Sequence, residues 1–492
     1  MALALLESSQ WGGTLPNFAP RISCGHRRPA QAPLAHTSRV RRDRSRSNLI
    51  GREQFMQWNG VLHAACGVLV MAASLALAAP KAMADDASWF HQLGRPDSNA
   101  DGGIATDPDG NVYVAGSTSG ALGGVAKGHT DAWLMKLDTG GRILWKRQPG
   151  TEAADWGEAV ATDRFGNVFV VGETFGPLGG TYKGDTDVWI IKFDADGRML
   201  WKRQPGTNGR ESPRGVATDA DGNVIVVGTT NSPFGGEKKG EANDHDAFVI
   251  KFDSDGRCLW KRQPGSDLYD EATGVTTDAA GNVYVVGFTE GALNGQKKDN
   301  HFYVSPFVIK FDTNGQFRWT REPSMYAYEM SGVVADGDGN VYIAGRFPTL
   351  GAGRGFDALK FNEDGQLVKK FKFDILNGIS VLGMAIDADG ILSFASLLYK
   401  PDNASDVLVF NTDADGTVLA HSVRTAPGYQ SPSRIAADSS GNVFVSGQSR
   451  LIVDSDSHYQ YDSFIAKFPL ASGVIAGSGS LRGEHDSIAR AR

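Results

Sequence analysis

The chain has 492 residues, of which 41% are hydrophobic and 21% charged, and its formal net charge is −7. This composition is typical of a globular protein with enough apolar residues for a core. Residues 1–84 hold ten Lys and Arg but three Asp and Glu, so the other residues hold 39 basic and 53 acidic side chains. An acidic body lacks the basic surface that nucleic-acid binding needs, which excludes that class of partner.

The first 84 residues have the composition of targeting segments. Residues 1–50 are rich in Arg and Ser and poor in acids, as transit peptides are. Residues 51–84 contain an uncharged run, Val61–Ala79, and then the small-residue cleavage site Ala82–Ala84. An apolar run before such a site is the signal-peptide pattern. We therefore expect cleavage after Ala84, which leaves Asp85 as the first residue of the mature protein.

Two such segments in tandem resemble the bipartite targeting sequences of thylakoid-lumen proteins, so the expected compartment is the chloroplast thylakoid lumen. Two alternatives stay open. The first is a plain export signal to the periplasm or the cell exterior, behind a start codon assigned too early. In the second, the run 61–79 is retained as an anchor, since nineteen residues can just span a bilayer. In each case membrane contact is expected through the N-terminal segment alone.

The rest of the chain is built from one repeat. Segments similar to Gly-Val-Ala-Thr-Asp-x-x-Gly-Asn-Val-Tyr-Val-Val-Gly begin at Gly102, Glu158, Arg214, Thr273, Ser331, Leu382 and Ser433. Their shared Asp recurs every 51 to 59 residues, from Asp107 to Asp438. A repeat of this length, present seven times, is typical of a propeller or a solenoid.

Each repeat contains four short β-type runs and no long stretch with helical periodicity. In the first repeat, Gly110 and Gly141 occupy the tight turns that join the runs in pairs. Such turns need a positive φ, which Gly adopts freely. Four antiparallel strands per repeat make a propeller blade. The predicted fold is therefore an all-β, seven-bladed β-propeller over residues 85–470, followed by a flexible tail, 471–492.

Side-chain size predicts the place of each run in its blade. The first run is rich in Gly, Ala and Thr and is expected next to the crowded propeller axis. The fourth run carries Trp145, Trp201, Trp260 or Trp319 between Lys and Arg, and is expected at the outer rim. Cys258 replaces an apolar residue of this run and is expected in the core. Because Cys24 and Cys66 precede residue 85, the propeller is expected to have no internal disulfide.

The seventh repeat lacks a fourth run, and the segment Ser88–Gly94 supplies one. This segment shares Trp-x-x-Gln-x-Gly with Leu144–Gly150, Leu200–Gly206 and Leu259–Gly265. Pairing it with the last repeat removes two exposed sheet edges. We therefore expect the N-terminal strand to complete the last blade and close the ring.

The pattern resembles the seven-bladed β-propeller (SBBP) repeat family and is broadly like the NHL propeller repeat. The resemblance rests on Asp-x-x-Gly-Asn-Val-Tyr-Val-x-Gly and on the Lys-Phe-Asp-x-x-Gly hairpin, as at Lys192–Gly197. It covers about residues 88–468, and the sixth repeat departs most, with Ile391 in place of the Asn. The resemblance implies the fold and leaves the function open.

Long loops are expected on one face of the propeller, where they join the second run to the third and one blade to the next. A rigid scaffold usually presents its function on such loops. Aromatic residues with polar groups occur in the blade-to-blade connections and suit partner binding. These candidate partner-binding residues are Trp156, Tyr269, Tyr326, Tyr328 and Tyr429.

Other polar residues on these loops are expected to be structural. Asp131, Asp187 and Asp246 recur five residues before a Lys of the third run, and a turn Asp bonds backbone amides. The loop Lys residues near 127, 183, 239 and 297 are expected to be solvated charges. The loop His residues are spread around the ring, and the Asp-x-Asp-Gly turns lack the other ligands of a calcium loop. We expect no metal site, no cofactor and no catalytic residue.

The sequence thus predicts a monomeric, non-catalytic scaffold that binds a protein or peptide partner through the long-loop face. The alternative is a propeller enzyme, a lyase or hydrolase acting on a carbohydrate or small molecule. The sequence contains no nucleophile elbow, zinc-protease motif, phosphate loop or dinucleotide fingerprint.

Overall fold

The computed structural model describes residues 88–93, 98–241, 244–293, 304–323, 329–347, 356–373, 379–400, 404–425, 428–452 and 459–470. In these residues all regular elements are strands and there is no helix, so the fold is all-β. None of these residues forms a helix long and apolar enough to cross a membrane. The predicted targeting segments and the tail lie outside the described residues.

Five sheets have four antiparallel strands each, hydrogen-bonded in chain order. Blade 1 contains β2 (Ser98–Thr106), β3 (Val112–Thr118), β4 (Asp131–Leu137) and β5 (Ile143–Arg147). Blade 2 contains β6 (Asp155–Thr162), β7 (Val168–Thr174), β8 (Asp187–Phe193) and β9 (Met199–Arg203). Blade 3 contains β10 (Glu211–Thr218), β11 (Val224–Thr230), β12 (Asp246–Phe252) and β13 (Cys258–Arg262). Blade 4 contains β14 (Asp270–Thr277), β15 (Val283–Thr289), β16 (Ser305–Phe311) and β17 (Phe317–Arg321). Blade 5 contains β18 (Glu329–Ala335), β19 (Val341–Phe347), β20 (Phe356–Phe361) and β21 (Leu367–Phe371).

The remaining strands belong to one eight-stranded sheet. Its first part contains β22 (Ile379–Ile386), β23 (Leu392–Tyr399), β24 (Ser405–Thr412) and β25 (Val418–Arg424). Its second part contains β26 (Tyr429–Ala437), β27 (Val443–Ile452), β28 (Tyr459–Phe468) and the N-terminal β1 (Trp89–Gln92). One parallel pair, Ser405 with Tyr429, links the two parts.

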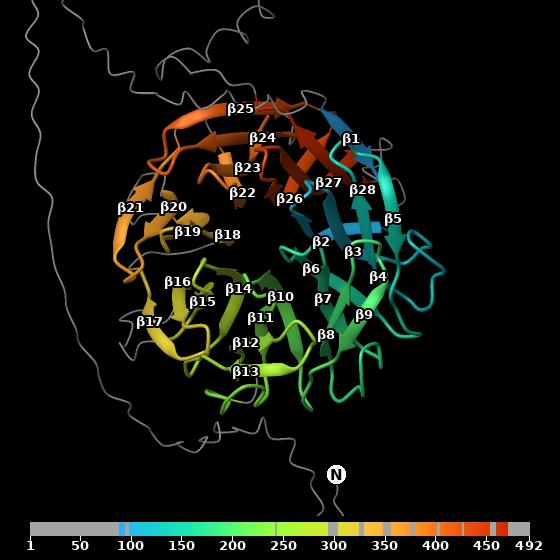
Figure 1. Ribbon diagram of the computed structural model, residues 1–492, viewed down its shortest axis with the longest axis vertical. Helices are drawn as coiled ribbons and strands as arrows, with labels where there is room; N and C mark the ends of the chain where they lie inside the picture. The colour runs from blue at the N-terminus through green and yellow to red at the C-terminus, as the bar shows by residue number, and fades with distance from the viewer. Residues whose placement is uncertain are drawn as a thin grey trace, which may run out of the picture. The chain divides into compact units, whose positions relative to one another are not determined.

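The sheets surround a common axis, with the first strand of each nearest the centre (Figure 1). β2, β6, β10, β14, β18, β22 and β26 contact one another in this order, and β26 contacts β2. This arrangement is a β-propeller. The expectation that the small first run lines the centre is met, because Gly, Ala and Thr leave room where the sheets converge.

The repeated Asp fixes the hairpin between the first and second strands. In blade 1 the Asp107 carbonyl accepts a hydrogen bond from the amide of Gly110 at 2.9 Å. The Asp107 carboxylate also accepts bonds from the amide and the side chain of Asn111. Gly110 has a φ of 79°, as the predicted turn requires.

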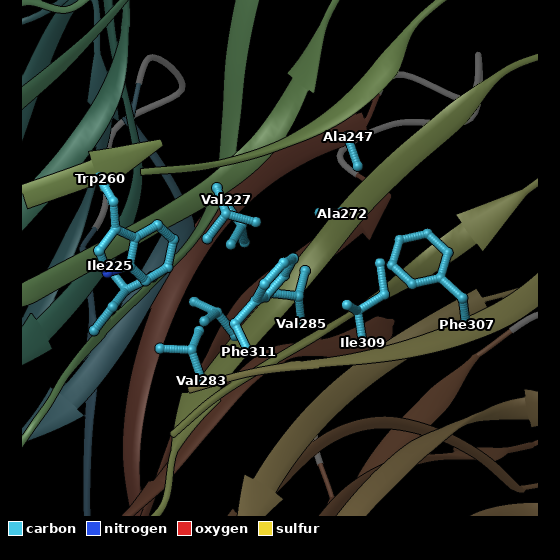
Figure 2. Close-up of a cluster of buried hydrophobic side chains, with 12 residues drawn as sticks. Ile225, Val227, Ala247, Trp260, Ala272, Val283, Val285, Phe307, Ile309 and Phe311 are labelled. Atoms are coloured by element: carbon cyan, nitrogen blue, oxygen red, sulfur yellow. The ribbon is translucent and has the colours of Figure 1, made fainter. Parts of the chain in front are cut away.

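The hydrophobic core lies in layers between neighbouring sheets. Figure 2 shows the layer between blades 3 and 4, in which Ile225 and Val227 of β11 face Val285 of β15 and Phe311 of β16. Strands two and three of each blade are almost fully buried, since sheets cover both of their faces. Burial on both faces explains why these strands are continuously apolar instead of alternating.

In blades 1–4 the outer strand is attached to the next blade by its Trp and its Arg. In β5, the Trp145 indole donates to the Ala195 carbonyl at 3.0 Å and the Arg147 Nε donates to the Gly197 carbonyl at 2.6 Å. Both acceptors lie in the β8–β9 hairpin of blade 2. The same pair of bonds leaves β9, β13 and β17. The repeated Trp and Arg are therefore links between blades.

A second link between blades runs around the axis near the short hairpins. The hydroxyl of Thr162 in β6 donates to the Thr106 carbonyl of β2 at 2.6 Å. Thr218 donates to the Thr162 carbonyl, Thr277 donates to the Thr218 carbonyl, and Thr106 donates to the Ala437 carbonyl. Three of these hydroxyls hold blades 1–4 to one another through their innermost strands, and that of Thr106 links blade 1 to β26.

The N-terminal strand β1 pairs antiparallel with β28, with Trp89 opposite Lys467 and Gln92 opposite Phe464. The Trp89 indole donates to the Thr139 carbonyl in the β4–β5 hairpin, as Trp145 does one blade later. The Gln92 amide contacts the carboxylate of Asp462, as Gln148 contacts Asp131. β1 therefore makes the contacts of an outer strand.

Candidate functional site: the long-loop mouth of the channel

Six of the innermost strands, β6, β10, β14, β18, β22 and β26, share a one-residue bulge at the same repeat position. In β6 the register shifts between Gly157 and Ala159, so Glu158 has no opposite residue in the β6–β7 strand register. The corresponding extra residues are Arg214, Thr273, Ser331, Leu382 and Ser433. A bulge leaves one residue outside the ladder and re-aims its side chain. The bulges thus re-aim one variable residue in each of these six strands.

Three of the bulge residues, Arg214, Thr273 and Ser331, line a cavity of about 490 Å³ on the axis, and all of the innermost strands contribute to its wall. Most of its wall is Gly, Ala, Val and Ile. Its polar lining residues are Arg214, Glu271, Thr273, Ser331 and Arg434. The Thr273 and Ser331 hydroxyls are buried and have no hydrogen-bond partner among the described residues. An unbonded buried hydroxyl is costly, so both groups can bond to a ligand that enters the cavity.

A charged network of blades 2–4 lies at the long-loop end of the cavity. The Arg214 guanidinium donates to the Glu271 carboxylate at 2.7 Å and lies 3.9 Å from the Glu158 carboxylate. The Tyr269 hydroxyl donates to the other Glu271 oxygen at 2.9 Å. Burial opposes the charge of Arg214, but the hydrogen bond and the charge of Glu271 together raise its pKa. Burial, followed by the Glu271 charge, raises the pKa of Tyr269, so it stays a neutral donor.

Beside this network lies a polar group anchored on Glu173 of β7, whose side chain is buried. The Ser212 hydroxyl donates to its carboxylate at 2.6 Å, and the Arg210 guanidinium lies 3.7 Å from it. Trp156, opposite Glu173 in the β6–β7 pairing, is 44% exposed. The mouth therefore combines an exposed indole with fixed charges of both signs.

The structure describes three of the five predicted aromatic residues and places each in a different setting. Trp156 lies in the innermost strand β6, so its predicted place in a blade-to-blade loop is wrong. Tyr269 directly precedes β14 and is part of the Glu271 network. Tyr429 begins β26 and has the Arg450 guanidinium 5.0 Å from its ring centre. Tyr326 and Tyr328 lie outside the described residues.

Three buried carboxylates hold the connections that enter the innermost strands. Asp155, Glu211 and Asp270 are fully buried, and each accepts a bond from the amide four residues earlier. In all three, burial is the largest effect and raises the pKa. The pKa of Asp270 rises to about 6. These buried carboxylates fix the backbone of the connections that form the mouth.

The repeated Asp of the third strand is structural, as predicted. Asp131 accepts a hydrogen bond from the amide of Lys127 at 2.8 Å and another from the Gln148 side chain at 2.9 Å. Asp187 and Asp246 accept the matching bonds. In the part of the chain that the structure describes, no three His, Cys, Asp or Glu side chains are grouped as metal ligands.

The bulge residues are not among the candidate residues predicted from the sequence, although the repeat alignment contains a signal for them. Each is the first residue of an aligned repeat segment, where Glu158, Arg214 and Thr273 differ while the following Val-Ala-Thr-Asp type residues agree. A position that varies between otherwise similar repeats is not fixed by the repeat's own packing.

A model of the SBBP beta-propeller repeat matches residues 88–124, 144–179 and 200–235. The chain contains SBBP beta-propeller repeats. It is 24% identical over 403 residues to the regulatory protein FlaEY of Caulobacter vibrioides. The aligned region covers 77% of this chain and 40% of that protein. It is 23% identical over 155 residues to an uncharacterised WD repeat-containing protein of Acanthamoeba polyphaga mimivirus, which covers 26% of this chain and 11% of that protein. The chain thus spans less than half the length of either relative.

Among solved structures, a polysaccharide lyase that acts on ulvan is similar with a TM-score of 0.43 and 11% identity, over 76% of this SBBP-repeat chain and 95% of that one. At this sequence identity and TM-score, the similarity does not indicate the substrate or the function of this chain.

Proposed function

We propose that this SBBP-repeat protein is a non-catalytic scaffold that binds a protein or peptide partner through the long-loop mouth of its channel. One observation carries the proposal: residues that vary between repeats gather there, around the exposed Trp156 and the Arg214–Glu271 pair. Binding energy in protein interfaces concentrates in Trp, Tyr and Arg near the centre of the contact. Fixed charges around them select the partner more than they strengthen binding.

The scaffold proposed here is a seven-bladed ring that β1 closes. Support comes from the ring of contacts among the seven innermost strands and from the outer-strand bonds of Trp89 and Gln92. On this view the eight-stranded sheet is two blades joined at Ser405 and Tyr429. A closed ring makes the mouth rigid, which lowers the entropic cost of binding.

The binding proposal is tested by affinity capture from native lysate with wild type and two variants. Trp156→Ala removes a side chain that is 44% exposed, so it should weaken capture by about tenfold or more and leave the melting temperature unchanged. The matched control is Phe165→Ala in the β6–β7 hairpin of the same blade, because Phe165 is 60% exposed on the opposite face. Equal loss in both variants, or capture that neither changes, would refute the assignment of the mouth. Turnover of a carbohydrate library by the purified protein would favour the enzyme alternative.

The place of action in this proposal is an exported compartment, the thylakoid lumen, reached by removal of residues 1–84. The Arg-rich leader and the apolar run before Ala84 support it. N-terminal sequencing of the native protein should begin at or near Asp85. A mature protein that begins near residue 1 would contradict the export step, and a fluorescent fusion outside plastids would contradict the lumen.

A further inference from the structure

Two grooves with the same construction lie on the outer side of the propeller in the part of the chain that the structure describes. One copy lies between blades 1 and 2 and has a volume of about 390 Å³; the other lies between blades 3 and 4 and has a volume of about 240 Å³. We call them the first and the second outer groove. Their linings correspond position by position in the repeat: Lys127 with Lys239, Arg147 with Arg262, Pro149 with Pro264, Leu178 with Leu293, Phe193 with Phe311 and Met199 with Phe317.

The floor of each outer groove is apolar and its upper edge is exposed. In the first groove Leu178 and Phe193 are about 5% exposed, whereas Met199 at the edge is 55% exposed. In the second groove Phe311 is 3% exposed and Phe317, in the place of Met199, is 59% exposed. Ile309 and Phe311 also belong to the core layer drawn in Figure 2, so the groove opens directly onto that layer. Large apolar side chains exposed at an open groove mark an interaction site.

The charges along both grooves have one sign. Lys127, Arg147 and Lys202 line the first groove, Lys239 and Arg262 line the second, and the described lining of neither includes an Asp or Glu. This contrasts with the acidic composition of the repeats. A ligand that suits both features has apolar groups for the floor and carboxylates for the rim.

The shape of the first groove suits an extended segment. Its lining runs from Lys127 and Thr151, near the long loops, to Gly197 in the short β8–β9 hairpin. It therefore follows the height of the blade beside the exposed outer strands β5 and β9. In the second groove the Thr320 hydroxyl is buried without a partner among the described residues and can bond to a main-chain group.

We propose that each outer groove binds an extended peptide segment in which large apolar side chains are flanked by Asp or Glu. The site is separate from the channel mouth, since the two share no lining residue. A partner with two such segments would engage both grooves at once and gain affinity from the linkage.

One position on the floor of the outer grooves differs between the repeats. Where blades 2 and 4 have Leu178 and Leu293, blade 3 has Phe234, which is 6% exposed. The Phe234 ring packs against Phe248 at 4.8 Å between centres, and the Lys261 ammonium lies 4.0 Å above it. We therefore expect a Phe at this position to fill the space beside the groove floor that Leu leaves open.

The test uses the full chain and a fluorescent peptide in which a Leu-Phe pair is flanked by Asp and Glu, with anisotropy as the readout. Two peptides should bind per chain, and added salt should weaken binding because the charges are exposed. Leu178→Phe and Leu293→Phe should each remove one site, and the double variant should remove both. Met199→Ala, at an exposed position that cannot disturb folding, should weaken the first site by about tenfold.

Three controls make the result decisive. A twin peptide with Asn and Gln in place of Asp and Glu should bind at least tenfold more weakly, and equal binding would overturn the charge argument. Decanoate should not displace the peptide; tighter binding of decanoate at the same sites would show a lipid-type ligand and overturn the proposal. Trp156→Ala should leave peptide binding unchanged, so failure here and failure at the channel mouth can be told apart. Peptide binding that survives in the folded double Phe variant would also refute the grooves as the site.

Discussion

Replacing Trp89 with Ala tests whether the N-terminal strand holds the propeller as outer strands do. Trp89 is half-buried, and its indole donates to the Thr139 carbonyl at 2.9 Å. Truncating a fully buried Trp costs about 3–5 kcal/mol, so half-burial gives about 2 kcal/mol. The lost hydrogen bond adds about 1 kcal/mol, for a total of about 3 kcal/mol. With an unfolding entropy of about 0.8 kcal/mol/K for roughly 380 residues, the melting temperature should fall by about 4 °C.

The assay is thermal and urea unfolding of Trp89→Ala beside Trp145→Ala. Trp145 makes the same indole bond to the next hairpin from within blade 1, to the Ala195 carbonyl at 3.0 Å. The two variants should therefore lose similar stability. A normal melting temperature for Trp89→Ala, with a clear drop for Trp145→Ala, would refute the attachment of β1.

Moving the strand tests closure itself. A variant that lacks residues 85–93 should melt lower and aggregate through the exposed edge of β28. Stability should return when residues 87–93 are appended after Phe468 through Asp-Ala-Asp-Gly-Arg, the loop that joins β8 to β9. In that loop Phe193 precedes Asp194 and pairs with Met199, so the same length restores Trp89 opposite Lys467. If the appended strand does not restore the melting temperature, then β1 does not stabilise the propeller by pairing with β28.

Three further outcomes are expected. Burial raises the pKa of Asp270 to about 6, so the folded state binds its proton more tightly than the unfolded state. This group therefore stabilises the fold at low pH, and that stability is lost as the pH rises from about 4 to 6. Asp270→Asn should reduce the change in unfolding free energy across this window, measured by urea unfolding, by on the order of 2 kcal/mol. Thr218→Val removes the bond to the Thr162 carbonyl and should cost about 1 kcal/mol in urea unfolding, whereas an unchanged midpoint would show that the axial hydroxyls are dispensable. Arg214→Met leaves Glu271 without its cation and should weaken partner capture by about tenfold or more in the same pull-down, while wild-type capture would contradict its place in the mouth.

The sequence predicts much of the fold because the repeat states each strand many times. The hairpin turns follow from Asp107 and Gly110, and the outer strand follows from Trp145. The use of β1 as an outer strand follows from the Gln that Ser88–Gly94 shares with the repeat, since Gln92 contacts Asp462 as Gln148 contacts Asp131. These are contacts within a repeat or between neighbours, so a local pattern records them.

The candidate site is less visible because it depends on register and on distant strands. A bulge at Glu158 adds one residue to a strand, and a pattern of apolar residues does not reveal which residue lacks an opposite residue in the strand register. Trp156 was expected in a loop because the repeat pattern begins two residues after it. β6 starts earlier, at Asp155, whose buried carboxylate holds the chain by bonding the Thr151 amide. The two outer grooves arise between blades, from residues that belong to different repeats.

Comparison of the outer strands also indicates a position at which β1 makes fewer hydrogen bonds than β5 does. In β5 the Arg147 guanidinium donates to three carbonyls, those of Gly197, Asp196 and Lys146. β1 has His91 at that position, and its Nε2 makes a single bond, to the Gly141 carbonyl at 2.6 Å. An Arg there has the matching carbonyls within reach on the β4–β5 hairpin, so His91→Arg should raise stability by about 1 kcal/mol in urea unfolding. The reciprocal Arg147→His should lower stability by a similar amount, since it removes the donor of the Asp196 carbonyl in the β8–β9 hairpin and of the Lys146 carbonyl in β5. If Arg147→His destabilises and His91→Arg does not stabilise, then β1 seats its side chains differently from the other outer strands, and the contacts of Trp89 alone attach it to blade 1.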